Sequence, residues 1–427
     1  LPVVRRAVHS SAVRTHREPA VRNTLILILV LNAVVATVKG CTTVGVAGLV
    51  QSGGFGSFSK NYGTAAAGLI EAEVVTADGK VRIANACSHP ELFWGLKGGG
   101  GGSLGVVTRL TLRTRELPET FGAAFGAIKA SSDTAFRALI AHVMSFYRSD
   151  LFNPHWGEQI VFQSDNTLRI SMVFQGLSQA QAQQVWAPFL AWVRARKDYT
   201  MARPIAIIAL PARHFWDPEF FRQHAPQFVV EDPRPGAPRK HFVWAGDQGQ
   251  VGWFLHGYRS VWLPASLLEQ RDQLPLVDAL FAASREWEFA LHFNKGLAGA
   301  PAAEIAAARD SATHPGMTEA FALAICASEG PPAFPGMPGH GPDLARARSD
   351  SAGVGRAMGA LLKVAPKAGS YVAESDYFEQ DWQRSFWGSN YPRLAAAKRK
   401  YDPDGLFFVH HGVGSESWGA DGFARRA

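Results

Sequence analysis

The sequence predicts an α+β protein in which an antiparallel sheet is covered by helices. Between residues 121 and 365, segments that alternate apolar and polar residues are interleaved with segments of helical apolar spacing. Short turns such as Asp78-Gly79 and Asp165-Asn166 join neighbouring strands, which favours antiparallel pairing. Strands and helices mixed in this way are typical of a sheet with helices packed on one face.

The composition agrees with a globular protein that has more than one core. The chain has 427 residues, of which 47% are hydrophobic and 19% are charged. No internal repeat is visible. The expected divisions are an atypical N-terminal segment (1–38), a glycine-rich region (39–120), a central α+β domain (121–365), a C-terminal segment (366–418) and a tail (419–427).

The charge and cysteine patterns exclude several classes of site. The formal net charge is +7, but Lys and Arg are scattered, so we expect an ordinary basic surface and no nucleic-acid partner. Cys41, Cys87 and Cys326 form no CxxC pair and cannot all pair, so neither a disulfide framework nor a zinc site is expected. The adjacent His410 and His411 have no further ligands at useful spacing, so no metal site is expected.

The N-terminal segment combines arginines with a short apolar stretch. The stretch "TLILILVLNAVVATV" (24–38) follows several Arg residues and is shorter than the about 20 residues that a membrane span needs. This order is similar to that of a signal peptide, but no clear small-residue cleavage site follows. A buried strand or helix fits equally well. The pattern leaves export and anchoring open and slightly favours a soluble protein.

The glycine-rich region predicts strands and turns. Residues 69–84 predict a hairpin that turns at Asp78-Gly79, and residues 89–98 predict a short turn or helix. Residues 105–117 alternate Val107 and Arg109 against Thr108 and Leu110, and therefore predict a strand with one buried face.

The central domain predicts alternating strands and helices. Strands are expected at 121–130, 158–176 (a pair), 251–264 and 286–299, and helices at 133–150 and 178–196. The Pro/Gly-rich residues 329–343 predict a mobile lid or edge loop. In the C-terminal segment, a helix is expected to end at Tyr401, because Asp402-Pro403 follows.

The glycine clusters raise the question of what presses against the main chain. Residues 100–105, "GGGSLG", fit GxGxxG, but a strand pattern follows instead of the helix that a Rossmann site requires. A second cluster lies at 40–63, with glycines at 45, 48, 53, 54 and 56. Bare main chain of this kind suits a flat or anionic ligand, although tight turns in a β-rich domain would also explain it.

Together these stretches resemble a known family. The segments "GCTTVGVAGLVQSGGFGSFSKNYG" (40–63), "AEVVTADGKV" (72–81), "PELFWGLKGGGGGSLGVVT" (90–108) and "NYPRLAAAKRKYDPDGLFFVHHGVGSESW" (390–418) are similar to FAD-linked oxidases of the berberine-bridge-enzyme type. These belong to the vanillyl-alcohol-oxidase superfamily, which has a PCMH-type FAD-binding domain. The resemblance is clear over residues 39–120 and 366–418. Residues 121–365 share only the general sequence pattern of the family's substrate domain.

The resemblance implies that residues 39–120 are the second half of the FAD-binding domain and that 366–418 return to it, while 121–365 form the substrate domain. Residues 1–38 show no glycine loop of the "GGHS" kind, so the N-terminal half of the FAD domain is expected to be missing. The implied cofactor-binding residues are Cys41, Thr43, Val44, Gly45, Gly48, Gly53, Gly54, Gly56, Gly105, Val106, Val107, Asn390 and Tyr391. The loops at 44–48 and 52–56 would lie along the flavin ring and pyrophosphate.

Particular residues carry further implications of the resemblance. Cys41 matches a position where many members bond the flavin through sulfur, although a lone cysteine is also a common small core residue. A small branched residue at the position of Val44 implies that oxygen can reach the flavin, which favours an oxidase. Alternatively, Val44 is an ordinary core valine. Two departures weaken the match: Phe55 stands where some relatives have an active-site tyrosine, and Ala373 replaces the asparagine of a Tyr-x-Asn stretch that begins at Tyr371.

Oxidation of an alcohol by a flavin needs a group that accepts the hydroxyl proton. Glu286, Glu288, His292 and Asn294 are expected on one face of a strand that could supply it, unless that face is simply solvated. We therefore take Tyr371, His292 and Glu288 as the candidate catalytic residues. Alternatives are Tyr377 and the pair His410 and His411.

The expected function is a FAD-dependent oxidase. It would transfer a hydride from an alcohol, a sugar or a secondary metabolite to flavin N5 and then reduce O2 to H2O2. Its partners would be a small-molecule substrate and O2, while the oligomeric state is left open. The alternative is a flavin-free remnant or binding module without catalytic activity, which the missing N-terminal half supports.

Overall fold

The structure is a computed structural model that describes residues 44–239, 241–245 and 252–426. The predicted N-terminal segment, with its apolar stretch 24–38, lies outside these residues, as do Cys41 and Thr43. The strands are β1 (Leu69–Val75), β2 (Val81–Asn85), β3 (Val106–Leu112), β4 (Thr120–Ala130), β5 (Trp156–Phe162), β6 (Thr167–Gln175), β7 (Tyr199–Pro211), β8 (Val229–Glu231), β9 (Phe242–Trp244), β10 (Trp253–Pro264), β11 (Phe289–His292) and β12 (Ala320–Pro332).

The α-helices are α2 (Val46–Gln51), α3 (Ser59–Tyr62), α4 (Pro90–Leu96), α5 (Asp133–Phe146), α6 (Gln179–Arg194), α7 (Pro218–His224), α8 (Gln273–Glu286), α9 (Ala302–Arg309), α10 (Leu344–Leu362), α11 (Trp382–Trp387) and α12 (Tyr391–Tyr401). None of the described helices has the length and hydrophobicity needed to cross a bilayer.

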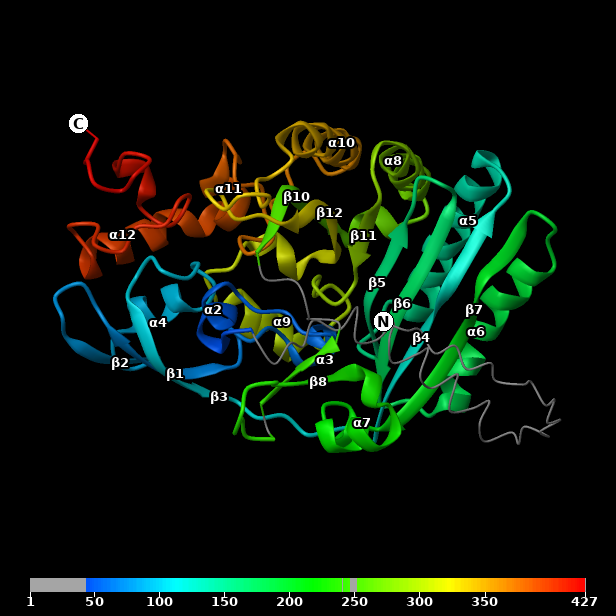
Figure 1. Ribbon diagram of the computed structural model, residues 1–427, viewed down its shortest axis with the longest axis horizontal. Coiled ribbons are helices and arrows are strands. Elements are labelled where there is room, and N and C mark those ends of the chain that lie inside the picture. Colours follow the sequence, from blue (N-terminus) through cyan, green and yellow to red (C-terminus); the bar gives the residue numbers. More distant parts are fainter. Residues whose placement is uncertain (1–43, 240, 246–251, 427) are drawn as a thin grey trace, which may run out of the picture.

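Two sheets divide the molecule into a small and a large part (Figure 1). The large sheet has seven strands in the order β10-β12-β11-β5-β6-β4-β7, and every neighbouring pair is antiparallel. The small sheet has the order β2-β1-β3 and is also antiparallel. This arrangement confirms the predicted α+β fold with an antiparallel sheet.

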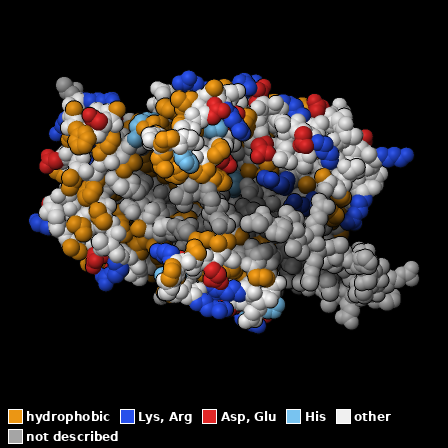
Figure 2. Space-filling model, viewed as in Figure 1, with side chains coloured by type: hydrophobic (Ala, Val, Ile, Leu, Met, Phe, Trp, Pro, Cys, Tyr) orange, Lys and Arg blue, Asp and Glu red, His pale blue; other side chains and the backbone are white. Residues whose placement is uncertain are grey.

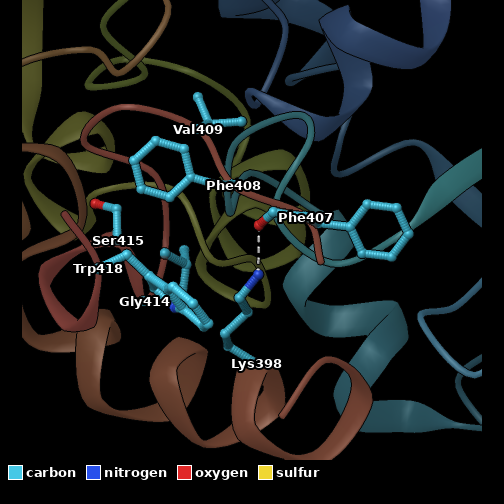
Figure 3. Close-up of a pocket in the computed structure, with 8 residues that line it drawn as sticks. Lys398, Phe407, Phe408, Val409, Gly414, Ser415 and Trp418 are labelled. Carbon is cyan, nitrogen blue, oxygen red and sulfur yellow. Dashed lines mark hydrogen bonds between the residues drawn. The ribbon is translucent and has the colours of Figure 1, made fainter. Parts of the chain in front are cut away.

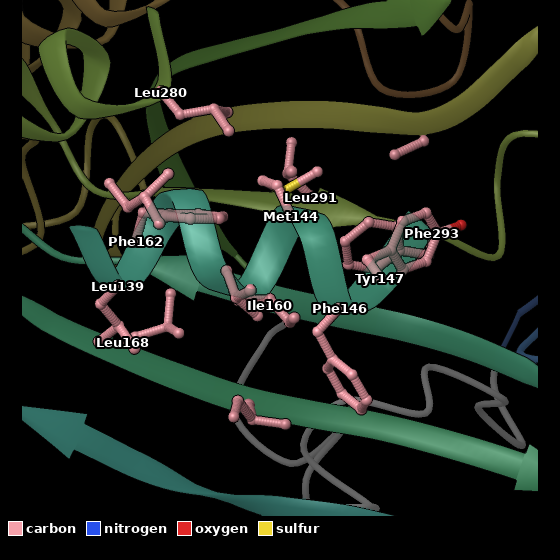
Figure 4. Close-up of a cluster of buried hydrophobic side chains, with 14 of the residues drawn as sticks. Leu139, Met144, Phe146, Tyr147, Ile160, Phe162, Leu168, Leu280, Leu291 and Phe293 are labelled. Carbon is pink, nitrogen blue, oxygen red and sulfur yellow. The ribbon is translucent and has the colours of Figure 1, made fainter. Parts of the chain in front are cut away.

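The main core lies between the seven-stranded sheet and the helices on one of its faces. Side chains of α5, α6, α8 and α10 pack there against β4, β5, β6, β11 and β12. Figure 4 shows Leu139 and Met144 of α5 among Ile160, Leu168 and Leu291 of the strands. The other face of the sheet is therefore left for contacts with the glycine-rich region.

Local sequence signals explain why the helices begin where they do. Ser132 caps α5 by accepting a hydrogen bond from the Ala135 N–H. Ser178 and Gln181 form a reciprocal capping box at the start of α6. Helix α12 ends at Tyr401, as the following Asp402-Pro403 predicted.

The small sheet and the C-terminal segment share one core. Leu69 and Val74 of β1 pack with Leu92 of α4, and Ala397 and Tyr401 of α12 join the same cluster. Residues from both ends of the described chain therefore build this part of the molecule (Figure 1).

Three predicted elements differ in the structure. The strand expected at 286–299 is limited to β11, because Glu286 still belongs to α8 and the chain turns away after His292. The loop expected at 44–48 is helical from Val46 onward, where the Gly45 and Gly48 carbonyls accept hydrogen bonds from the N–H groups of residues 49 and 52. Strand β3 is mostly exposed, with only Val107 and Leu110 packing partly against the small core.

Candidate functional site

The two glycine segments meet around Thr313. A Cβ on Gly53 would lie 3.0 Å from Thr313 Oγ1, and a Cβ on Gly98 would lie 2.1 Å from the same atom. The Gly100 N–H also donates to the Gln51 carbonyl at 2.8 Å. The clusters that the sequence singled out are therefore neighbours in space.

Protein atoms fill the space beside most of the later glycine run. A Cβ on Gly99 would lie 2.7 Å from Leu394, and one on Gly102 would lie 2.8 Å from Val409. Trp387 Nε1 donates to the Gly98 carbonyl at 3.1 Å. Close packing within the chain therefore requires glycine at these positions, whereas a Cβ on residue 101 would meet no atom within 4 Å.

The earlier glycines divide into two groups. Gly53 and Gly54 have φ of 109° and 72°, and a Cβ on Gly54 would lie 2.6 Å from the Cβ of residue 65, so local packing already demands glycine there. A Cβ on Gly45, Gly48 or Gly56 would meet nothing within 4 Å. The main chain at these three positions borders open space.

Besides Gln51 Oε1 within the segment, two buried polar atoms on neighbouring elements have no hydrogen-bond partner in the described part of the chain. They are Thr313 Oγ1, which lies against Gly53, and Asn294 Oδ1, whose amide nitrogen bonds to Gly56. Buried polar atoms are nearly always paired, so unpaired ones indicate a missing partner. The open glycines and these orphaned atoms fit a flat, hydrogen-bonding ligand along residues 45–56.

Tyr371 lies directly against the same segment. Its hydroxyl accepts a hydrogen bond from the Gly54 N–H at 3.3 Å. The ring packs edge-on against Phe55, with centroids 5.1 Å apart, and Trp262 lies 6.2 Å away. Burial, and then the charge of Glu374, raise the pKa of Tyr371 well above its usual value, so the phenol stays protonated at neutral pH.

A charge pair adjoins Tyr371. Lys295 Nζ binds the Glu374 carboxylate, and both side chains are largely buried. Burial and the charge of Glu374 also raise the pKa of Tyr258, which lies on β10. The site thus combines two protonated phenols with a paired carboxylate.

The other two candidate catalytic residues lie on or beside β11. His292 is half-buried at the end of β11, opposite Leu323 of β12 and Gln159 of β5. Glu288 precedes the strand, is exposed, and accepts a hydrogen bond from Gln163 Nε2 at 2.9 Å. Both assignments stay predictions.

The remaining predicted cofactor residues lie in different surroundings. A Cβ on Gly105 would lie 2.7 Å from the carbonyl of residue 75, and Val106 is exposed while Val107 packs partly on the small core. Asn390 Nδ2 donates to the carbonyls of residues 311 and 313 at 3.3 and 2.8 Å. Asn390 therefore fixes the main chain of Thr313, which contacts both glycine segments.

Tyr391 and Val44 complete the predicted set. The Tyr391 hydroxyl donates to Glu416 at 2.5 Å and accepts from the Gly414 N–H at 3.2 Å, so it anchors the C-terminal segment. Val44 is 49% exposed. In the part of the chain that the structure describes, no group of His, Cys, Asp and Glu side chains could hold a metal ion.

A pocket elsewhere is structural. It is lined by Lys398, Phe407, Phe408, Val409, Val413, Gly414, Ser415 and Trp418 (Figure 3). Lys398 Nζ binds Asp402 and donates to the Phe407 and Ser103 carbonyls at 2.6 and 2.8 Å. These contacts join the C-terminal segment to the glycine run, so the pocket belongs to the packing of the small part of the molecule.

The surface agrees with the scattered positive charges of the sequence. On the face in Figure 2, Lys and Arg side chains are dispersed among acidic and apolar ones.

Comparisons with known proteins bear on this geometry. A family profile described as "Berberine and berberine like" matches residues 370–414, which include Tyr371 and helix α12. The FAD-linked oxidoreductase malF of Malbranchea aurantiaca is 29% identical over 91% of this chain and 60% of its own length. The VAO-type flavoprotein oxidase VAO615 of Thermothelomyces thermophilus is 27% identical over 90% of this chain and 61% of its own.

The chain is similar to berberine-bridge-like FAD-linked oxidoreductases. The crystal structure of the VAO-type flavoprotein MtVAO615 from Myceliophthora thermophila C1 matches this chain with a TM-score of 0.67 and 25% identity, over 90% of this chain and 64% of that one. Glucooligosaccharide oxidase from Acremonium strictum matches with a TM-score of 0.63 and 18% identity, over 89% and 72%. These comparisons confirm the predicted resemblance to this family, the predicted fold and FAD as the cofactor.

The chain spans about three fifths of the length of the curated relatives that it matches. The activity, substrates and partners of the whole protein are therefore matters for a proposal.

Sequence reasoning missed Thr313, Lys60 and the inward role of Asn294. A lone Thr between helices carries no motif, and a lysine in a short polar stretch is usually exposed. Lys60 is nevertheless fully buried, because residues more than 200 positions away in the chain accept its hydrogen bonds. Hydropathy alone could not supply that signal.

Proposed function

We propose that this chain is the flavin-facing and substrate-facing part of a FAD-dependent oxidoreductase. The observation that supports this most directly is the open main chain at Gly45, Gly48 and Gly56, next to Tyr371. FAD, when bound, supplies a hydride acceptor and a route for the electrons to O2. The residues of this chain bind the cofactor, orient the substrate and shield both from water.

The roles proposed for the glycines, Thr313 and Tyr371 follow from contacts, and those of His292, Glu288 and Cys41 from the sequence. Gly45, Gly48 and Gly56 allow a flat cofactor to approach the main chain, and the unpaired Oγ1 of Thr313 supports a hydrogen bond to it. Tyr371, which keeps its proton, donates a hydrogen bond to a substrate oxygen. His292 or Glu288 accepts the substrate proton, and Cys41 forms the covalent link to the flavin.

The finer part of the proposal is an oxidase that reduces O2 to H2O2. Exposed Val44, beside the open glycines, supports access of oxygen. The substrate is a small molecule: an alcohol, a sugar or a secondary metabolite. Two structural neighbours are by name a glucooligosaccharide oxidase and a carbohydrate oxidase, which supports including sugars in the first substrate panel.

The proposal is tested by titrating the purified chain with FAD and following quenching of flavin fluorescence. We expect saturable binding that Gly48→Val and Gly56→Val weaken by about tenfold or more, because a side chain there enters only the ligand's space. Gly341→Val is the matched control, since its Cβ position is also open but lies in a loop outside the site. Equal affinities in all three variants would overturn the assignment.

Oxidase activity is tested separately on the FAD-loaded chain. Oxygen uptake with matching H2O2 release on alcohols or sugars supports the oxidase, and reduction of an artificial electron acceptor without oxygen uptake favours a dehydrogenase.

A second candidate function is a flavin-free remnant. It is favoured by the protein atoms that fill the space at Gly98, Gly99 and Gly102, where a ligand would otherwise approach the main chain. A wild-type chain that binds no FAD in the titration would favour this alternative over the proposed function.

A further inference from the structure

The glycine loop at residues 53–57 is pressed onto the large sheet at β5. A Cβ on Gly157 of β5 would lie 2.0 Å from the Ser57 carbonyl oxygen, so main chain meets main chain there. The next residue, Glu158, has a φ of 66° and is almost fully buried. A positive φ at a residue other than glycine is a strained conformation that the surroundings must hold.

Asn294 reaches from the sheet to this loop. Its Nδ2 donates to the Gly56 carbonyl at 3.1 Å and lies 3.5 Å from Glu158 Oε1. Only 3% of Asn294 is exposed. Because both neighbours are acceptors, the hydrogen-bond network assigns the amide nitrogen to this side.

Lys60 reaches in the opposite direction, from the helix after the loop to the chain after β11. Its Nζ donates to the Gly296 and Ala298 carbonyls, both at 2.7 Å, and lies 5.4 Å from the centre of the Phe152 ring. Only 1% of Lys60 is exposed. Burial lowers the pKa of Lys60 to about 7, and the amine can donate both hydrogen bonds with or without its extra proton.

The hydrogen bonds of Asn294 and Lys60 join the same two segments in opposite directions. Asn294 belongs to the stretch that leaves β11 and binds the loop, and Lys60 belongs to the stretch that leaves the loop and binds residues 296–298. At the other end of the loop, the Gly54 N–H is held by Tyr371. The open position at Gly56 is therefore fixed from both sides.

We propose that Asn294 and Lys60 are positioning residues that lock the loop at residues 53–57 onto the large sheet and thereby set the floor of the ligand site. The lock itself is a property of the chain alone. Its importance for the cofactor rests on the proposed function.

Hydrogen–deuterium exchange of the FAD-free chain tests the lock directly. In Asn294→Ala and in Lys60→Met, we expect amides in peptides that cover residues 53–58 to exchange about tenfold faster or more. Peptides from β6 should keep their protection, which separates local release from general destabilisation. The exposed Lys367→Met serves as the matched control and should leave all peptides unchanged.

A second variant guards against misfolding. Asn294→Asp keeps the shape of the side chain but cannot donate to the Gly56 carbonyl, so it should release the loop as Asn294→Ala does. Unchanged exchange at residues 53–58 in Asn294→Ala and Lys60→Met overturns the proposal, whether or not the chain binds FAD.

The FAD titration adds a readout that general stability does not move. If the wild-type chain binds FAD, Asn294→Ala should raise the dissociation constant by about tenfold, while Lys367→Met should not. If FAD affinity is unaltered while the loop exchanges faster, Asn294 holds the loop but has no role in the ligand site. A wild-type chain that binds no FAD counts against the proposed function, and exchange then decides the lock.

Discussion

Thr313 is wedged against Gly98 so closely that a Cβ on the glycine would lie 2.1 Å from the threonine Oγ1 and 2.7 Å from its backbone nitrogen. Residue 313 is held there by Asn390, which binds its carbonyl. The glycine at 98 is thus demanded by contacts within the chain, and the same contact brings the two glycine segments together.

The first prediction concerns this contact. Gly98→Ala should lower the free energy of unfolding by about 2–4 kcal/mol, because φ is 108° and no space exists for the methyl group. Gly101→Ala, three residues on, should change it by less than about 0.5 kcal/mol, since its Cβ position is open. Urea unfolding of both variants measures the difference, and similar losses in the two would contradict the packing explanation.

The second prediction concerns pH. Burial, and then the charge of Arg384, lower the pKa of His314 from 6.5 to about 4. Between these two pH values His314 is protonated in the unfolded chain but neutral in the folded chain. The free energy of unfolding therefore falls as the pH drops from 6.5 towards 4. The loss approaches about 3 kcal/mol at the lower end.

Chemical unfolding across that pH range checks the effect. His314→Gln should flatten the pH dependence, whereas the exposed His224→Gln should keep the wild-type slope. Parallel slopes in all three proteins would rule out His314 as the cause.

The third prediction concerns the buried pair of Lys398 and Asp402. Both side chains are almost fully buried, so Lys398→Met leaves an unpaired carboxylate and should cost about 3–5 kcal/mol. Protease cleavage should then appear within residues 402–418, because the Phe407 carbonyl loses its donor. Lys367→Met, at an exposed site, is the control, and a resistant Lys398→Met chain would show that this anchor is dispensable.

The fourth prediction concerns the hydroxyl of Tyr371. Tyr371→Phe keeps the ring contacts with Phe55 and Trp262 but leaves the Gly54 N–H without its acceptor. We expect a loss of about 1 kcal/mol in stability, which is typical of one net hydrogen bond. Tyr377→Phe, at a residue that is 64% exposed, should have no measurable effect. Urea unfolding compares the two, and equal losses would contradict this reasoning.

Elements with local signals were predictable from the sequence. The hairpin of β1 and β2, the capped helix α6 and the end of α12 at Tyr401 each depend on residues within a few positions. The strand after "GGGSLG" also formed, which removes the Rossmann interpretation. Short-range turn and capping chemistry is enough to decide such elements.

Features that depend on distant residues were not predictable in the same way. Asn294 was placed on a strand face, but it lies beyond the end of β11 and binds a carbonyl 238 positions away. The glycine run at 98–102 was interpreted as main chain beside a ligand, yet Thr313, Leu394 and Val409 occupy the space beside three of its members. A run of glycines indicates that other atoms lie close to the main chain, but it does not tell whether those atoms belong to a ligand or to the protein.

The return of α12 to the small sheet has a consequence for biosynthesis. The small sheet, β1 to β3, shares its core with Ala397 and Tyr401, which leave the ribosome long after those strands. The early strands must therefore persist beside a nascent large domain with part of their apolar surface uncovered. We expect this region to be the last to become protease-resistant during synthesis, and cofactor loading to follow release of the finished polypeptide.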